Sequence, residues 1–166
     1  MDTAQKIQRL IEQYPTRQSA LMPSIWAVQD AQGWVSPESI DMLVETLGVT
    51  RAKVEELLTF YTMFRTAPPA KHCLQVCRNI SCNLMGARNL IAHLEQRLGV
   101  RLGETTPDGQ FALEGVECLG ACGHAPVMQL GKHYYEHLTP DKVDVIIESL
   151  RRGVVPRADT DRELEA

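Results

Sequence analysis

Apolar residues in the first sixty positions recur at intervals of three and four, which is the period of an amphipathic helix. Four such stripes follow one another. The first ends before Pro15, the second at Gly33 and the third at Gly48, and proline and glycine are common helix stops. We therefore expect a small bundle of helices over residues 3–64. The side chains expected in its core are Ile7, Leu10, Ile11, Tyr14, Leu21, Ile25, Val28, Ile40, Leu43, Val44, Leu47, Val54, Leu57, Leu58 and Tyr61.

Local signals place the helix starts within this bundle. Ser36 before Pro37 is a capping hydroxyl followed by proline at the first helical position, and Thr50 is the corresponding cap of the fourth helix. Pro23 lies inside the second stripe, where we expect a kink near the first turn. We interpret the remaining sulfur and aromatic side chains as core rather than as a cofactor site, namely Met42, Phe60, Met63 and Phe64.

The pattern changes after the only proline pair, Pro68-Pro69, which suits a stiff join between two units. Leu74 and Val76 then alternate with other residues, as in a half-buried strand over residues 73–77. The elements expected after this strand are a helix over residues 87–98, a strand from Phe111, two short strands at 127–130 and 134–135, and a helix from Pro140 to Leu150. This order predicts an α/β layer with a four-stranded sheet, similar to the thioredoxin-like arrangement.

The chain is thus expected to have three parts. They are a helical bundle over residues 1–67, an α/β domain over residues 70–152 and a polar tail over residues 153–166. The apolar pattern vanishes beyond Gly153. We expect residues 157–166 to be either disordered or ordered only against a partner.

Composition excludes several classes of function. A formal net charge of −4 and a pI of about 5.7 provide no basic field for nucleic acid or for an acidic membrane surface. No apolar run approaches the length that spans a bilayer, and the N-terminus lacks the features of an export signal. We therefore expect a cytoplasmic protein whose five cysteines are reduced thiols or metal ligands.

Four of the five cysteines form two short-spaced pairs. Cys77 and Cys82 are separated by four residues, and Cys118 and Cys122 by three. The loop of residues 78–81 can curl Cys82 back toward Cys77, while Gly120 allows a tight turn in the second pair. Backbone N–H groups in such loops can point at sulfur and stabilise a thiolate. The two pairs together therefore predict one metal centre.

The ligand type alone fits both a zinc ion and an iron–sulfur cluster, and redox-active dithiols are a third alternative. Three points favour the cluster. Neither pair has the Cys-x-x-Cys knuckle, the chain has enough apolar material to fold without a metal staple, and four thiolates on two loops can embrace a two-iron, two-sulfide core. A zinc-stapled interaction module remains open. A thiol oxidoreductase is disfavoured because a Cys-x-x-Cys motif at a helix start is absent.

The residues around these pairs have less specific roles. An extended strand rises about 3.3 Å per residue, which places Cys73 about 13 Å from Cys77, too far for both to bind one cluster. We interpret Cys73 as a small buried side chain. His124 can replace a cysteine, as in Rieske centres, but four cysteines already complete the set, so a neighbouring role is the alternative. Arg78 either donates near the cluster or faces solvent.

The other histidines have no partners at ligand spacing in the sequence. We interpret them as surface or structural residues, namely His72, His93, His133 and His137.

Several short segments carry a further signal. Val-Cys-Arg-Asn-Ile-Ser-Cys at 76–82 and Glu-Cys-Leu-Gly-Ala-Cys at 117–122 are the most specific. In order and spacing, over roughly residues 5–150, they resemble the 24 kDa subunit family of respiratory NADH dehydrogenase (complex I), whose members are two-iron ferredoxins. The supporting segments are residues 33–35, 59–61, 84–87, 103–109 and 125–127.

This resemblance implies a thioredoxin-like [2Fe-2S] ferredoxin domain preceded by an N-terminal helical bundle. It implies that the cluster ligands are Cys77, Cys82, Cys118 and Cys122, and Cys73 matches no ligand of the family. The implied role is an electron-transfer subunit of NADH-quinone oxidoreductase that exchanges single electrons with FMN. No catalytic residue of its own is implied.

The resemblance also implies the partners. The chain shows no Gly-x-Gly-x-x-Gly loop, so FMN and NADH are expected on a partner flavoprotein subunit, and further iron–sulfur subunits are reached through it. The assembly would be peripheral on the inner face of the cell membrane, with no direct membrane insertion and no nucleic acid. The same fold serves the diaphorase parts of NAD-dependent formate dehydrogenases and NAD-reducing hydrogenases, so the host complex stays open.

Overall fold

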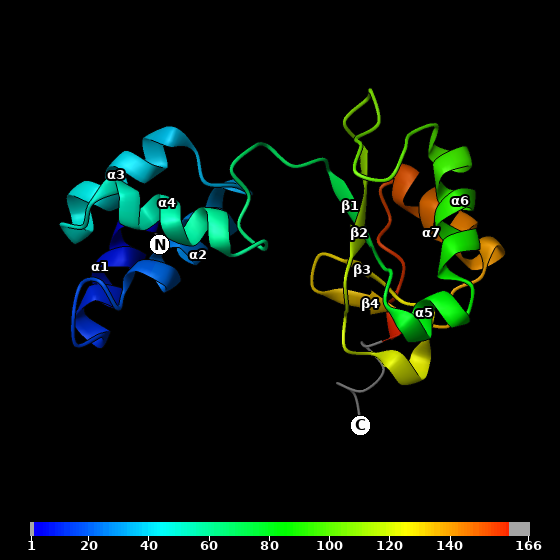
Figure 1. Ribbon diagram of the computed structural model, residues 1–166. Helices are drawn as coiled ribbons and strands as arrows, with labels where there is room; N and C mark the ends of the chain where they lie inside the picture. The colour runs from blue at the N-terminus through cyan, green and yellow to red at the C-terminus, as the bar shows by residue number, and fades with distance from the viewer. Residues whose placement is uncertain (1, 160–166) are drawn as a thin grey trace. The chain divides into compact units, whose positions relative to one another are not determined.

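The computed structural model describes residues 2–159 of the chain. Its backbone divides between Pro69 and Ala70 into two compact units (Figure 1). None of the helices in the described part combines the length and the apolar character that crossing a bilayer requires.

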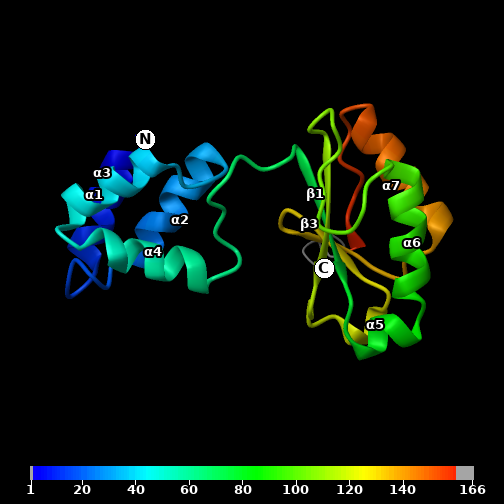
Figure 2. The ribbon, with the colours of Figure 1, turned by 45° about the horizontal axis from the view of Figure 1, so that its top comes forward.

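The first unit is built from helices whose apolar faces share one core (Figure 2). Ser36 caps the third helix, because its hydroxyl accepts a hydrogen bond from the Ser39 N–H at 3.2 Å. Thr50 is the N-cap residue of the fourth helix, as predicted, although its side chain makes no capping hydrogen bond within the described residues. The helices are α1 (Thr3–Gln13), α2 (Leu21–Gln32), α3 (Pro37–Leu47) and α4 (Arg51–Phe60).

Three side chains expected in this core lie on the surface, namely Tyr14, Phe60 and Met63. Tyr14, the residue after the end of α1, is 40% exposed. Phe60 is 75% exposed and Met63 is 44% exposed. Phe60 is the last residue of α4 and Met63 lies in the turn beyond it, where the helical period no longer sets the direction of a side chain. The core prediction does hold for Phe64, which is buried with its ring centroid 5.3 Å from that of Trp26.

The second unit is a mixed sheet with helices α6 (Ala87–Leu98) and α7 (Pro140–Arg151) packed together on one face (Figures 1 and 2). The spatial order of the strands is β2-β1-β3-β4. The first two strands pair in parallel, β3 pairs antiparallel to β1, and β3 and β4 form a hairpin. The strands are β1 (His72–Cys77), β2 (Phe111–Val116), β3 (Met128–Leu130) and β4 (His133–Tyr135).

The core of this unit lies between the sheet and the two helices. Leu74 and Val76 of β1 are fully buried, as their alternation predicts. They pack in one cluster with side chains that the helical periodicity also placed inside, including Leu90, Leu94, Val143, Ile146 and Ile147.

A short helix replaces part of a predicted loop. α5 (Ile80–Leu84) begins three residues after Cys77, and the Asn79 side chain caps it by accepting from the Ile80 N–H at 2.7 Å. The loop expected over residues 78–81 is therefore wrong in its second half. The Asn79 cap lets a five-residue helix form and turn Cys82 inward, where it is buried.

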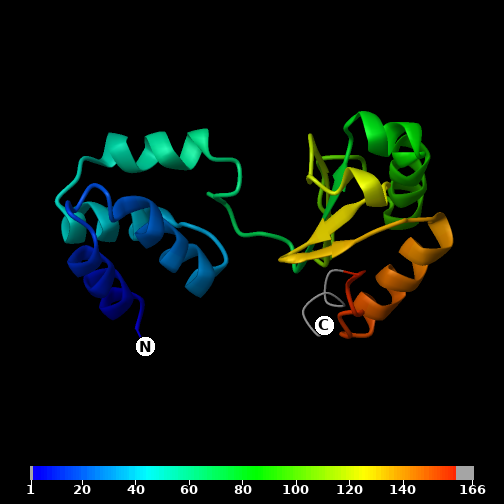
Figure 3. The same ribbon diagram turned by 90° about the horizontal axis from the view of Figure 1, so that it is seen from below.

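The segment after α7 is also different from the prediction. The Tyr135 hydroxyl donates to the Pro156 carbonyl at 2.7 Å, and the Glu136 N–H donates to Asp159 Oδ2 at 2.9 Å. Ala158 is buried in the same core as the sheet. Residues up to Asp159 thus pack on their own domain (Figure 3), so the expectation of disorder or of a partner is wrong for 157–159. The rest of the predicted tail, 160–166, lies outside the described residues.

Candidate metal centre

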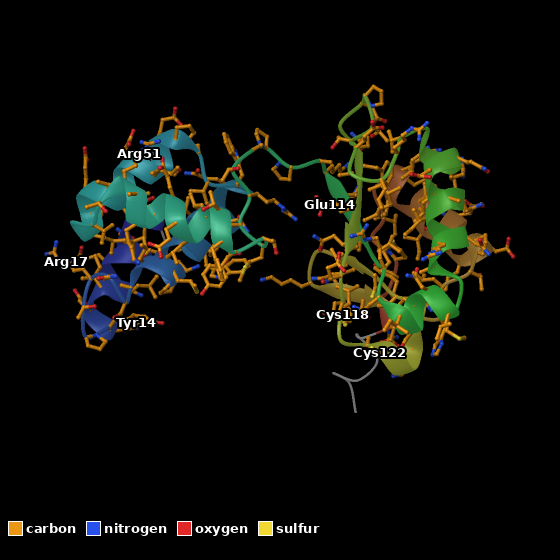
Figure 4. The ribbon with its side chains drawn as sticks, in the orientation of Figure 1. Tyr14, Arg17, Arg51, Glu114, Cys118 and Cys122 are labelled. Atoms are coloured by element: carbon orange, nitrogen blue, oxygen red, sulfur yellow. The ribbon has the colours of Figure 1, made fainter. Side chains whose placement is uncertain are left out.

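The four paired cysteines gather at one edge of the sheet. Cys77 is the last residue of β1, and Cys82 lies in α5. Because β1 and β2 are parallel, Cys77 is opposite Val116, and the chain reaches Cys118 two residues later. Cys122 begins the 3-10 turn η1 (Cys122–His124), which contacts α5. Figure 4 shows Cys118 and Cys122 together on this loop.

Individual contacts link the two pairs. The Cys77 thiol donates to the carbonyl of Glu117, with a sulfur–oxygen distance of 3.8 Å, and Glu117 directly precedes Cys118. The Cys82 thiol is hydrogen-bonded to Cys77 and lies within electrostatic reach of Cys122. The structure therefore brings Cys82 close to Cys122, which is forty residues away in the sequence.

Burial distinguishes the first pair. Cys77 and Cys82 are 3% and 2% exposed and pack with Ala87, Ala125 and Val127. Burial raises the pKa of the Cys82 thiol to about 11, and the hydrogen bond with Cys77 acts in the same direction. A thiol with that pKa is protonated at neutral pH, so a metal that binds it must release the proton.

Backbone donors meet two of the sulfurs. The Gly120 N–H points at Cys118 Sγ with a nitrogen–sulfur distance of 3.4 Å, and the backbone of Val127 is hydrogen-bonded to Cys82. Gly120 has a φ of +78°, a conformation that glycine adopts without strain. Such bonds stabilise the negative charge of thiolates around a metal centre. The Ala125–Pro126 peptide bond beside this loop is cis.

Two residues near the cysteine pairs, Cys73 and Arg78, are not among the candidate ligands. Cys73 is buried at the far end of β1, opposite Ala112, as the extended geometry predicts. Arg78 pairs with Glu117, with 2.7 Å between Nη2 and Oε1, and its side chain crosses the backbone at Gly115. Arg78 was open to two roles, donation near the cluster or exposure to solvent. The structure shows the second, because Arg78 is exposed and forms a surface ion pair with Glu117.

One histidine has neighbours that its sequence spacing does not reveal. His137 is exposed, as the surface interpretation predicts, but one ligand atom from each of His124, Glu136 and His137 lies within 4.8 Å of the other two. His124 Nδ1 is 3.1 Å from Glu136 Oε2. The β3–β4 hairpin returns the chain to η1, and no sequence spacing reports that return. His93 is structural, because its Nε2 is 3.0 Å from Asp144 Oδ1.

The spacing of the sulfurs bears on which metal group fits. Tetrahedral zinc with bonds of about 2.3 Å to sulfur would hold all four sulfurs about 3.8 Å apart. Among residues 2–159, no three cysteine sulfurs lie within 4.8 Å of one another. Two cysteine pairs on separate segments suit a binuclear cluster, in which each iron takes two cysteines. The buried pair, the exposed pair and the backbone donors therefore fit a [2Fe-2S] group.

Comparisons with known proteins agree with this chemistry. The family model described as "Thioredoxin-like [2Fe-2S] ferredoxin" matches residues 7–151. An E-type subunit of the NADH-quinone oxidoreductase of Rhizobium meliloti is 45% identical over 151 residues, which are 91% of this chain and 90% of that protein. NADH-quinone oxidoreductase subunit 2 of Thermus thermophilus is 37% identical over 150 residues, 89% of this chain and 83% of that protein.

A solved structure supports the fold. The crystal structure of an NAD⁺-reducing [NiFe]-hydrogenase superposes with a TM-score of 0.70 at 18% identity, covering 78% of this chain and 23% of the hydrogenase chain. At that identity the likeness concerns the fold alone.

Proposed function

The chain belongs to the thioredoxin-like [2Fe-2S] ferredoxin family, and on this premise we propose that it is the electron-transfer subunit of an NADH-quinone oxidoreductase. Its cluster ligands are Cys77, Cys82, Cys118 and Cys122. The observation that carries the proposal is the meeting of these four cysteines at one edge of the sheet. The names of two relatives that align over most of their length indicate the host enzyme.

Each part of the site has a distinct task. When bound, a [2Fe-2S] cluster accepts and releases one electron at a time. Cys77 and Cys82 supply two thiolates from a dry, packed environment, and Cys118 and Cys122 supply two from a solvent-exposed loop. The backbone donors at Gly120 and Val127 offset the negative charge of the sulfurs.

The partner is a flavoprotein subunit that binds FMN and NADH and passes electrons on to further iron–sulfur subunits. It docks on the exposed apolar side chains of α5 and the residue after it. Ile80, Leu84 and Met85 are 73%, 82% and 63% exposed and flank buried Cys82. Soluble proteins rarely expose a contiguous apolar patch without a partner for it. A docking surface beside a ligand also keeps the distance for electron transfer short.

The remaining parts of the chain follow from this assignment. The ferredoxin domain spans residues 70–152, with residues 153–159 packed against it, and the bundle of residues 1–67 provides a second docking surface. The assembled complex holds the subunit peripherally on the inner face of the cell membrane.

Substitution of one exposed ligand tests the cluster. In anaerobically prepared protein, Cys118→Ser should remove or reshape the visible absorption and the paramagnetic signal of the reduced state, while far-ultraviolet circular dichroism keeps the helical content. The matched control is Cys73→Ser, a buried cysteine on the same strand as Cys77, which should retain two irons and two sulfides. Zinc in place of iron in the parent protein, or an unchanged spectrum in Cys118→Ser, would contradict the proposal.

A charge in the apolar patch tests the partner. Leu84→Glu should reduce co-purification with the flavoprotein while iron content stays unchanged. Val145→Glu is the matched control, because Val145 lies on α7 and is 64% exposed but does not belong to the patch. If both variants co-purify equally, α5 is not the docking surface. Quinone reduction by the purified complex distinguishes this host from a hydrogenase or a formate dehydrogenase.

A further inference from the structure

A second group of side chains that can ligate a metal contains none of the cysteines, although its first member, His124, lies two residues after Cys122. His124 is the last residue of η1, and Glu136 and His137 follow β4. One ligand atom from each lies within 4.8 Å of the other two. The ring centroids of the two histidines are 5.3 Å apart. Two imidazoles and a carboxylate are a common ligand set of transition-metal sites.

The backbone holds the two contributing segments together. The His137 N–H donates to the His124 carbonyl at 2.8 Å, and the Leu138 N–H donates to the Pro126 carbonyl at 3.1 Å. His137 has a φ of +47°, and it is the only residue other than glycine with positive φ in the described part of the chain. This left-handed backbone conformation is uncommon for residues other than glycine. In this conformation the His137 ring lies beside the ring of His124.

The backbone of Glu136 is held by hydrogen bonds at both its N–H and its carbonyl. Its N–H donates to Asp159 Oδ2 at 2.9 Å, and its carbonyl accepts from Lys142 Nζ at 2.6 Å. Its side chain is only 16% exposed. Lys142 Nζ is also 2.8 Å from Asp159, so the nearby positive charge already has a carboxylate partner. The Glu136 carboxylate therefore presents its charge to the histidines.

From this geometry we propose that His124, Glu136 and His137 bind one divalent transition-metal ion of the zinc class, separately from the cysteine centre. Bonds of about 2.0–2.2 Å to nitrogen and oxygen require ligand atoms about 3.3 Å apart. The contact between His124 and Glu136 is already 3.1 Å, and the exposed histidine rings close the remaining gap by rotation. The ion replaces the contact between His124 and Glu136 with a bond to each, and water fills its open positions.

Zinc binding to the cluster-loaded chain tests the site. After treatment with a chelator that spares the iron, calorimetric titration with Zn²⁺ should give one site per chain. His124→Asn, Glu136→Gln and His137→Asn should each weaken binding at least tenfold, since even loss of an outer partner costs about 10–100-fold. Asparagine tolerates the left-handed backbone at position 137, so that variant preserves the fold.

The control is His133→Asn, an exposed histidine on β4 outside the group, which should leave zinc affinity unchanged. Iron and sulfide are measured in every variant. If zinc binds at the cysteines instead, the iron content should fall, and zinc binding should persist in the histidine variants. Absence of a stoichiometric site in the parent chain, or full binding in the His124→Asn/His137→Asn double variant, would overturn the proposal. Neither result depends on electron-transfer activity.

Discussion

The two cysteine pairs meet at the same edge of the sheet but lie in opposite surroundings. Cys77 and Cys82 belong to a strand and a helix and are buried, whereas Cys118 and Cys122 lie on a loop and are exposed. Cys77 and Cys82 are therefore part of a hydrophobic cluster, and residues of the loop that carries Cys118 and Cys122 pack against that cluster. We therefore expect changes around the buried pair to alter the stability of the fold, and changes around the exposed pair to alter mainly metal binding.

The largest expected difference is in thiol reactivity of the metal-free chain. With a pKa of about 11, only about one Cys82 thiol in a thousand is ionised at pH 8, and the thiolate is the form that reacts. Iodoacetamide should therefore modify Cys82 at least about 100-fold more slowly than Cys118, as followed by peptide mass spectrometry. Because the pKa is raised, the Cys82 rate should increase about tenfold per pH unit until pH approaches 11. Equal rates at pH 8 would remove the distinction between the pairs.

The next effect concerns packing around each pair. Val127→Ala should lower the free energy of unfolding by about 2 kcal/mol, because Val127 is 1% exposed and packs against Cys77 and Cys82. Leu119→Ala, the control in the exposed loop, should cost less than about 1 kcal/mol because Leu119 is only partly buried. Urea denaturation of the metal-free chains measures both. A larger loss for Leu119→Ala would show that the loop is part of the folded core.

A smaller effect concerns the packing of the side chain of Arg78, which follows Cys77, against Gly115 of β2. A Cβ at Gly115 would come within 2.6 Å of Arg78 Cδ and 2.9 Å of Leu102 Cδ2, so Gly115→Ala must displace both side chains. We expect a loss of about 1 kcal/mol, the low end of overpacking costs, because long side chains can move. Adding Arg78→Ala should relieve part of it in a double-mutant cycle. Strict additivity would indicate that Arg78 does not cross Gly115.

The smallest effect is that of the ion pair between Arg78 and Glu117. Both side chains are largely exposed, so Glu117→Gln should change stability by no more than about 0.5 kcal/mol. Iron content should stay the same, since the carbonyl that accepts from Cys77 is retained. A loss of iron in Glu117→Gln would mean that the carboxylate itself organises the loop.

Much of the fold was predictable because it depends on local signals. The period of apolar residues, the cap at Ser36 and glycines such as Gly99 predicted the helices of both units. The expected α/β fold, thioredoxin-like and preceded by a helical bundle, is confirmed by the family match and the observed architecture. The local signals failed where an element ended, as at Phe60 and Met63, and where a side-chain cap at Asn79 created a helix too short to show a period.

The sequence by itself identified the candidate ligands, since four paired cysteines, their glycines and the surrounding motifs are readable along the chain. Only the tertiary structure decided which sulfurs are buried, that residues 157–159 pack on their own domain, and that His137 meets His124 and Glu136. The physical reason is that spacing and periodicity describe neighbours within one element. Contacts across the sheet and around a hairpin depend on strand order and register, which are set by the packing of the whole domain.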